Sequence, residues 1–227
     1  MKKIFLFVSI AALLASCTPK PKVGLEVKIH NNYSLMNKKF IINQVIDGTV
    51  VYADTTKIKK DQFQMDIPYK GQGLLNVSIP GSNVDDIMLV AEEGKVQLDI
   101  DGTQLHFTGT PLNDRLQDFY QKRDSVSLLF KQLNDEKKAF DSQPLPDKLT
   151  PKMKEELQQK SDEFQQRRMQ LIKDNTDRII AFIKENVDNQ VGEYYFTNNY
   201  IIFPLEQKLI LKSFATPKLK KRFSIKD

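Results

Sequence analysis

The chain has 227 residues, with 34 lysines and arginines against 29 aspartates and glutamates, two histidines and one cysteine. This length suits one large domain or two small ones and is sufficient to bury an adequate core. Acidic and basic residues are interleaved along most of the chain, whereas a nucleic-acid-binding protein concentrates lysine and arginine on one element. We therefore expect no nucleic-acid partner.

Residues 1–16 are predicted to be a secretory signal peptide. Lys2 and Lys3 give a positive start, about a dozen apolar residues follow, and Ala15 and Ser16 are the small residues that a signal peptidase requires. This apolar run is shorter than the roughly 20 residues of a membrane-spanning helix, and no other stretch comes near that length. The N-terminal segment is thus predicted to direct export.

Residues 14–17, Leu-Ala-Ser-Cys, resemble the bacterial lipobox, whose cysteine thiol accepts lipid. A plain signal peptide followed by an incidental cysteine is the alternative. The lipobox predicts that Cys17 becomes acylated and carries palmitate, and because each buried methylene contributes about 0.8 kcal/mol, several acyl chains would anchor the protein durably. Lipidation of the single cysteine would leave no thiol for disulfides, nucleophilic catalysis or metal binding.

Residues 17–22 are predicted to form a tether, because Pro19 and Pro21 favour an extended backbone. In the usual sorting rule for bacterial lipoproteins, the residue after the cysteine matters, and Thr18 in place of aspartate implies the outer membrane. Surface-exported lipoproteins of Bacteroidetes tend to carry acidic residues here, whereas this tether is basic. The resemblance therefore implies a lipid-anchored protein of the cell envelope that faces the periplasm.

Residues 23–110 are predicted to form an antiparallel β-sandwich or open barrel. Val23, Leu25, Val27 and Ile29 alternate with polar residues, which places them on one face of a strand. Seven similar runs follow, separated by turn residues, at 40–46, 50–52, 63–67, 74–79, 87–90, 96–100 and 105–107. No helix-length crossover intervenes, which favours an antiparallel arrangement over a parallel sheet.

Residues 111–189 are predicted to form a long antiparallel helical hairpin. After Thr110-Pro111 the apolar residues recur at three- and four-residue intervals, Pro144 and Pro146 interrupt this pattern, and Thr150-Pro151 begins a second helix. The helices should contain roughly 30 and 36 residues and extend about 45 and 54 Å. Three cations interrupt the apolar stripe and predict a seam that is polar in places: Arg123, Lys137 and Arg168.

Residues 190–227 are predicted to form two or three short helices rich in aromatic side chains. Such side chains need a cover, and internal packing is the first expectation. The alternative is a partner surface formed by Tyr194, Tyr195, Phe196, Tyr200 and Phe203. A basic cluster near the C-terminus is expected to be a solvated helix end, with a patch for anionic lipid as the alternative; it comprises Lys218, Lys220, Lys221 and Arg222.

No constellation of residues predicts a reaction, so we expect no catalytic residue, metal site or cofactor, and hence no enzyme. His30 and His106 are expected to be solvated strand residues rather than ligands. The paired carboxylates Asp85-Asp86, Glu92-Glu93 and Asp99/Asp101 lie beside turns, where acids are common for local hydrogen-bonding reasons. Calcium binding or glycosidic chemistry is the alternative for them, but Thr108 stands where an EF-hand needs its bidentate glutamate. Tyr33, Tyr52 and Tyr69 are expected to pack across strands rather than to stack on sugars.

Three segments resemble the uncharacterised β-rich domain found ahead of thioredoxin-like domains in Bacteroidetes lipoproteins: VVYADTTKIKKDQFQMDIP, LVAEEGKVQLDID and FTGTPLNDRLQDF. The shared features are turns at residues 61–63 and 92–94 and the Gly-Thr-x-x-Asn-Asp pattern at 109–114, and the resemblance covers most of residues 23–120. Such relatives usually continue into a thioredoxin fold with a Cys-x-x-Cys site. This chain has no such site, and thiol–disulfide exchange needs an attacking thiolate.

The first functional prediction is a membrane-anchored, non-catalytic binding or scaffolding module, with an envelope protein or a glycan as its partner. The second is an accessory or truncated relative of a thioredoxin-like oxidoreductase, which would work with a separate catalytic protein through the 194–203 surface. A hydrolase that uses turn carboxylates ranks last.

Overall fold

The computed structural model describes residues 21–144 and 149–225. The predicted signal peptide, Cys17 and most of the predicted tether lie outside these ranges. The chain divides into two compact units, Met1–Thr110 and Pro111–Asp227, so that one unit ends where the sequence changes its period. The first is the β unit and the second is the helical unit.

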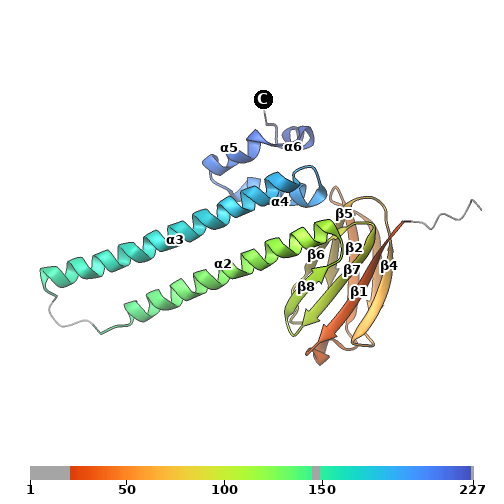
Figure 1. Ribbon diagram of the computed structural model, residues 1–227, viewed down its shortest axis with the longest axis horizontal. Coiled ribbons are helices and arrows are strands. Elements are labelled where there is room, and N and C mark those ends of the chain that lie inside the picture. Colours follow the sequence, from red (N-terminus) through yellow and green to blue (C-terminus); the bar gives the residue numbers. More distant parts are fainter. Residues whose placement is uncertain (1–20, 145–148, 226–227) are drawn as a thin grey trace, which may run out of the picture. The chain divides into compact units, whose positions relative to one another are not determined.

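The β unit consists of two open four-stranded sheets (Figure 1). One sheet has the order β4-β1-β7-β8, and the other has the order β3-β2-β5-β6. The strands are β1 (Lys22–His30), β2 (Lys39–Ile46), β3 (Thr49–Lys57), β4 (Gln62–Pro68), β5 (Gly73–Ser78), β6 (Ile87–Ala91), β7 (Gly94–Asp101) and β8 (Gln104–Thr108). A short 3-10 helix, η2 (Tyr33–Leu35), follows β1. The predicted sandwich is confirmed.

One strand pair departs from the antiparallel expectation. β1 and β7 pair in parallel, from Val23 opposite Gly94 to His30 opposite Asp101. On its other side β1 pairs with β4 in the antiparallel sense. The first strand is therefore inserted between two later ones. Local alternation cannot reveal this pairing, because the partner strands lie far apart in the sequence.

The core of the β unit follows the period-2 pattern. Val23, Leu25 and Val27 of β1 are buried, and Gly24, Glu26 and Lys28 point to the opposite face of the sheet. The other strands add further fully buried side chains, among them Phe40, Ile42, Leu75, Leu98 and Ile100. Each of these contributes roughly 1.5–3 kcal/mol through burial. The result is a continuous apolar core.

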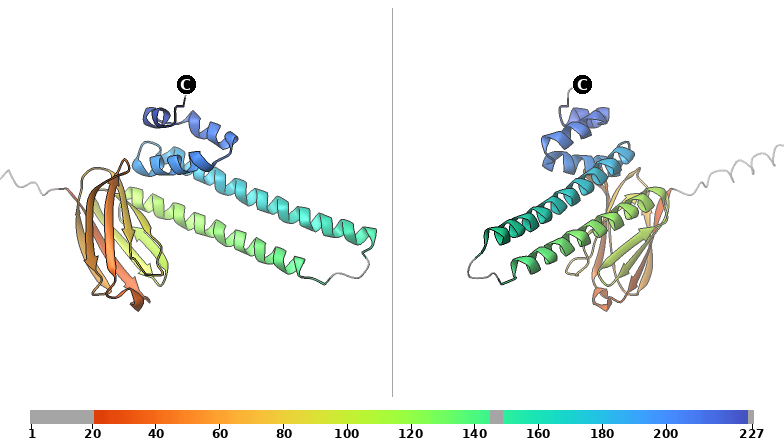
Figure 2. Two further views of the ribbon diagram at one scale, coloured as in Figure 1. Left: turned by 180° about the vertical axis from the view of Figure 1, so that it is seen from behind. Right: turned by 60° about the vertical axis from the view of Figure 1, so that its left-hand side comes forward.

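The helical unit begins with the predicted hairpin, and both views of Figure 2 show its two long helices side by side. They are α2 (Pro111–Asp141) and α3 (Pro151–Asn186), with 31 and 36 residues. Thr150 caps α3 by accepting a hydrogen bond from the Met153 amide, and Pro151 occupies the first turn. No helix among the described residues is long and apolar enough to cross a bilayer.

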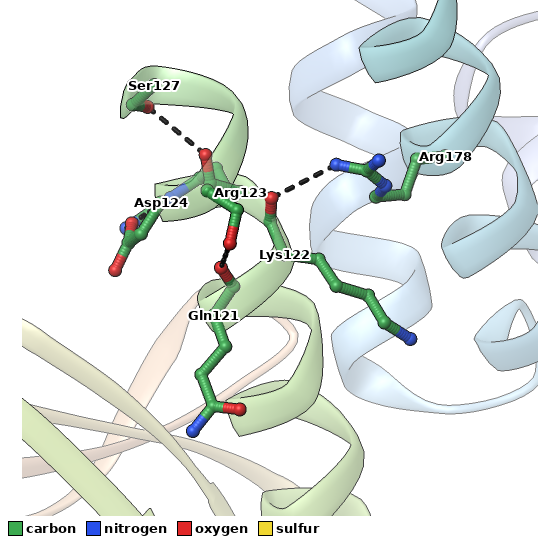
Figure 3. A network of polar contacts seen from close by, with 7 residues as sticks. Gln121, Lys122, Arg123, Asp124, Ser127 and Arg178 are labelled. Carbon is green, nitrogen blue, oxygen red and sulfur yellow. Dashed lines mark hydrogen bonds and ion pairs between the residues drawn. The ribbon is translucent and has the colours of Figure 1, made fainter. Parts of the chain in front are cut away.

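The seam between α2 and α3 is narrow and partly polar. Of the three cations predicted in it, Arg168 donates a hydrogen bond across it to Asn134 at 3.4 Å, whereas Arg123 and Lys137 pair within α2 with Asp124 and Asp141. Its buried α2 residues Phe119, Val126 and Leu133 are spaced seven residues apart, which is the repeat of a two-helix coiled coil. Between them, the Arg178 guanidinium donates a hydrogen bond of 3.0 Å to the Lys122 carbonyl oxygen (Figure 3). Farther along, Arg167 donates to both carboxylate oxygens of Glu136, at 2.6 and 3.2 Å.

Three short helices complete the helical unit: α4 (Gln190–Ile202), α5 (Leu205–Ser213) and α6 (Pro217–Arg222). Their core joins them to the end of α3 and comprises Ile180, Ile183, Phe196, Phe203, Leu211, Ala215 and Leu219. Gly192 lets α4 approach α3 closely, because an added Cβ would lie 1.8 Å from the Asn186 carbonyl oxygen. Internal packing thus covers much of the aromatic C-terminal segment.

Candidate functional site

A groove of about 540 Å³ lies on the β unit, where β1, β4 and the start of β7 meet. Gly24 of β1 lines it and leaves the strand bare at a position where its neighbours on the same face carry side chains. A Cβ added to Gly24 would lie 3.6 Å from the Gly94 carbonyl oxygen, an ordinary contact. The glycine is therefore not required for backbone geometry. The lack of a side chain at Gly24 leaves the groove open.

Charged side chains of both signs surround this groove. The Lys22 ammonium lies 2.7 Å from the Asp66 carboxylate, and both residues are exposed. Gln64 and Lys95 line the groove as well. Because the register places Gly24 opposite Asp66 on one side and opposite Lys95 on the other, these charges flank the bare position directly.

Glu26 fixes one side of the groove. Its side chain is only 9% exposed, and its carboxylate forms ion pairs with Lys95 and, at 3.5 Å, with Lys28. It also accepts a hydrogen bond of 2.9 Å from the Gln62 amide. The hydrogen bond from Lys95 holds the pKa of Glu26 below its ordinary value. Glu26 is therefore a charged group that positions Lys95, and it is not set up to exchange protons near neutral pH.

The described lining of the groove is polar and charged. Its described lining residues include ammonium, carboxylate and amide groups, but no aromatic ring, histidine or hydroxyl nucleophile. Beside the groove, β4 is an edge strand, which among the described strands pairs only with β1. An edge strand presents unpaired backbone N–H and C=O groups to which an extended peptide can add. The charged groove and the edge of β4 therefore lie next to each other on the β unit.

The histidines and turn carboxylates singled out in the sequence lie near one another only as two cross-strand pairs among the described residues. His106 lies opposite Asp99 in the β7–β8 register, and His30 lies opposite Asp101 in the β1–β7 register. Asp99 accepts a hydrogen bond from Gln97, and Asp101 accepts one from Asn31. In the described part of the chain, no group of three or more histidine, cysteine, aspartate or glutamate side chains lies close enough to hold a metal ion.

The three tyrosines considered for sugar stacking differ in their environments. Tyr52 is half-buried, and its hydroxyl donates to Asp54 at 3.1 Å, while Tyr69 is also half-buried. Tyr33 is 86% exposed, so the expectation that it packs across strands is wrong. It lies in η2 rather than in a strand, because Asn31, with a φ of 53°, turns the chain out of β1.

The five aromatic residues considered as a partner surface divide into buried and exposed members. Phe196 and Phe203 lie in the core of the helical unit and cannot form such a surface. Tyr195 packs against Phe119 and Phe182, with ring centroids 5.1 and 5.3 Å apart. Burial raises the pKa of the Tyr195 hydroxyl. Tyr200 is half-buried and stacks on Phe196, whereas Tyr194 is 42% exposed.

Sequence reasoning missed two features. The groove had a signal in Gly24, since an isolated glycine within a strand leaves that face of the sheet without a side chain. The other feature is a set of exposed aliphatic residues around the α4–α5 junction: Ile201, Ile202, Leu205, Leu209 and Ile210. Its signal was the run Leu209-Ile210-Leu211, because one buried face of a helix cannot hold three consecutive apolar residues.

The two-sheet architecture defines a β-rich domain, and residues 23–116 match the family model of a domain of unknown function, DUF4369. This match confirms the resemblance derived from the turn motifs. A comparison with curated proteins finds no match. Among solved structures, similarity is found to one described as "a putative cell adhesion protein from Bacteroides ovatus", with a TM-score of 0.29 and 12% identity. The similarity covers 40% of this chain and spans 43% of that neighbour's length.

Proposed function

We propose that the protein is a lipid-anchored protein of the cell envelope whose β unit is a non-catalytic binding module for an extended segment of another envelope protein. The observation that carries this proposal is the charged groove at Gly24 beside the unpaired edge of β4. Backbone hydrogen bonds to the β4 edge would supply affinity, and a side chain placed in the groove would supply specificity.

The anchor rests on Cys17 and the lipobox-like residues before it. The strand β1 begins at Lys22, five residues after Cys17, and five residues reach at most about 18 Å. Lipidation would therefore hold the Lys22 end of β1, where the groove lies, close to the membrane. Thr18 and the basic tether favour the periplasmic face of the outer membrane for this anchor.

A protein segment fits the groove better than a glycan does. Sugar-binding grooves stack pyranose rings on aromatic side chains, and no aromatic residue is among the described groove lining. A peptide carries amide groups along its length and charged side chains of either sign. The groove offers a partner for each of these groups: Lys95 for acidic side chains, Asp66 for basic side chains and Gln64 for amide groups.

The accessory role toward a thioredoxin-like oxidoreductase stays a prediction. Of the five aromatic residues assigned to it, only Tyr194 is exposed, at 42%. A catalytic partner would therefore have to recognise the exposed aliphatic residues around α5 as well.

Lipidation is tested by metabolic labelling with a palmitate analogue, with Cys17→Ser as the comparison. The wild-type protein should incorporate the label and partition into the detergent phase of Triton X-114, and the variant should do neither. Labelling of Cys17→Ser, or a wild-type protein that stays in the aqueous phase, would contradict the anchor.

Peptide binding is tested with a display library of random decapeptides selected on the mature chain, followed by titration of a selected peptide. Gly24→Val fills the groove, and Gln104→Val adds the same side chain to an exposed position of β8 as a matched control. Gly24→Val should weaken binding at least tenfold, and Gln104→Val should not. Equal binding to both variants, or selection of no peptide while a glycan array gives specific binding, would overturn the proposal.

A further inference from the structure

The junction between α4 and α5 carries an exposed aliphatic patch. It consists of Ile201 and Ile202 at the end of α4 and of Leu205, Leu209 and Ile210 in α5. These side chains are between 43% and 74% exposed. Soluble proteins tolerate single exposed apolar residues, but a cluster of this kind marks a surface that meets another apolar phase.

The core of the helical unit does not account for this patch. α5 buries Leu211 against Phe203 and Leu219, which fixes its inner side. Leu205 and Leu209 are one helical turn apart and lie on the outer side. α5 is therefore apolar on two sides, and the outer side has no partner among the described residues of the helical unit.

The same segment is strongly basic. Residues 203–225 contain six lysines and arginines and a single acidic residue, Glu206. Some of the cations have local roles, since Lys218 pairs with Glu193 and Lys208 lies 6.0 Å from the centre of the Tyr200 ring. Lys221 and Arg222 are exposed. The rest of the mature chain has acidic and basic residues in near balance, so positive charge is concentrated in the same stretch of sequence as α5.

We propose that the aliphatic patch inserts into the interface of an anionic lipid bilayer while basic residues of the same C-terminal segment contact phosphate headgroups. Apolar side chains beside lysines are the combination that interfacial helices use to bind anionic membranes. Protein interfaces are instead enriched in aromatic residues, methionine and arginine, and none of the five patch residues is of these types. The composition thus favours a lipid surface over a protein partner.

This inference goes beyond the proposed function, because it requires neither Cys17 nor the groove. In a chain that is also anchored through Cys17, the same contact would be strengthened, because it would form as an intramolecular event with a high effective concentration. The patch would then set the orientation of the helical unit at the membrane, rather than provide the anchor.

The sequence contains no tryptophan, so one introduced tryptophan reports on a single position. Ile202→Trp places the reporter in the patch, and Leu128→Trp places it at an exposed site of α2 as a matched control. The chain is produced from residue 18 without its leader, which removes the lipid and retains all described residues. Vesicles of phosphatidylethanolamine with phosphatidylglycerol should shift the emission of the Ile202→Trp variant to shorter wavelength, and brominated lipids should quench it. The emission of the Leu128→Trp variant should change little.

Co-sedimentation with the same vesicles supplies a second measurement. The double variant Leu205→Asp/Leu209→Asp should lower the bound fraction at least tenfold, whereas Leu128→Asp/Leu129→Asp should not. Lys221→Glu/Arg222→Glu should weaken binding to anionic vesicles and leave binding to pure phosphatidylcholine unchanged. Circular dichroism melting checks that the variants fold, which is expected because the substituted hydrophobic side chains are exposed.

An unchanged emission of the Ile202→Trp variant with vesicles, or equal sedimentation of both aspartate variants, would overturn the proposal. So would a concentration-dependent emission shift without lipid that coincides with dimers in light scattering, because a second copy would then cover the patch. A shift seen only with an added envelope protein would assign the patch to a protein partner instead. None of these results bears on peptide binding at the groove.

Discussion

The two units of the chain bury their apolar residues in different ways. The β unit has a continuous core, in which alternate residues of neighbouring strands, such as Leu25 and Leu98, are completely buried. The α2–α3 hairpin has a single stripe of buried residues. Its two helices are also linked by polar bonds from Arg178 and Arg167 of α3 to α2. Stability should therefore be concentrated in the β unit and in the core around Phe196. The hairpin should be the part that opens first.

The largest effect should come from the core of the β unit. Phe40 is fully buried and meets Phe63 edge-to-face with ring centroids 5.2 Å apart. Phe40→Ala should lower the free energy of unfolding of the β unit by about 3–5 kcal/mol, because it leaves a large cavity. Urea unfolding followed by hydrogen exchange of strand amides measures this. A loss below that of Leu133→Ala in the hairpin would reverse the proposed distribution of stability.

A somewhat smaller effect is expected where α3 and α4 touch. In Gly192→Ala the new methyl group would meet the Asn186 carbonyl oxygen, and the backbone must move. The cost should be roughly 3 kcal/mol, the upper part of the range for overpacking, even though alanine favours helices. Thermal unfolding followed at 222 nm measures it, with the exposed Asn198→Ala as control. Equal melting temperatures of the two variants would show that α3 and α4 can move apart without a loss of stability.

The hairpin seam should respond less and only locally. Leu133→Ala removes one of the few buried residues of the stripe. We expect a loss of about 2 kcal/mol, at the low end for such a change, because an open seam can admit water. Amide hydrogen exchange should accelerate in the middle of α2 and α3 and stay constant in the β strands. Faster exchange throughout the β unit would show that the units do not differ as described.

The smallest effect concerns the polar outer face of the β unit and depends on pH. Since the pKa of Glu26 is lower in the folded protein than the ordinary value of about 4.3, its charge stabilises the fold above that value. This stabilisation is lost as the pH falls through the folded-state pKa. Glu26→Gln should thus be less stable than the wild type at neutral pH, and the two urea midpoints should converge in acid. Lys95→Met should behave alike, whereas a difference that is constant with pH would contradict the role of this charge.

Much of the fold follows from local patterns in the sequence. The alternation from Val23 to Ile29 predicted β1, and Thr150 with Pro151 predicted the start of α3. These signals are local, because the spacing of apolar residues and the capping residues of an element lie within or next to its own stretch of sequence. The parallel pairing of β1 with β7 had no such signal, since it depends on which distant strands pack together.

The site was less predictable than the fold. The groove exists because register places Gly24 between Asp66 and Lys95, which come from different strands. Spacing along the chain does not contain this information. The aromatic residues of α4 were recognised as needing a cover, but periodicity could not decide that the unit's own helices cover Phe196 and leave Ile202 outside.

The insertion of β1 between β4 and β7 has a consequence for the order of assembly. Synthesis delivers the chain from its N-terminus, so β1 emerges before its two neighbours, which begin only at Gln62 and Gly94. The pairing of this strand is complete only when Asp101 has emerged opposite His30. Such a long-range closure is slow compared with a hairpin. A chain exported through a membrane channel would therefore remain unfolded enough to pass through it until Asp101 has emerged. The pairing of β1 with β7 would be completed only after that point.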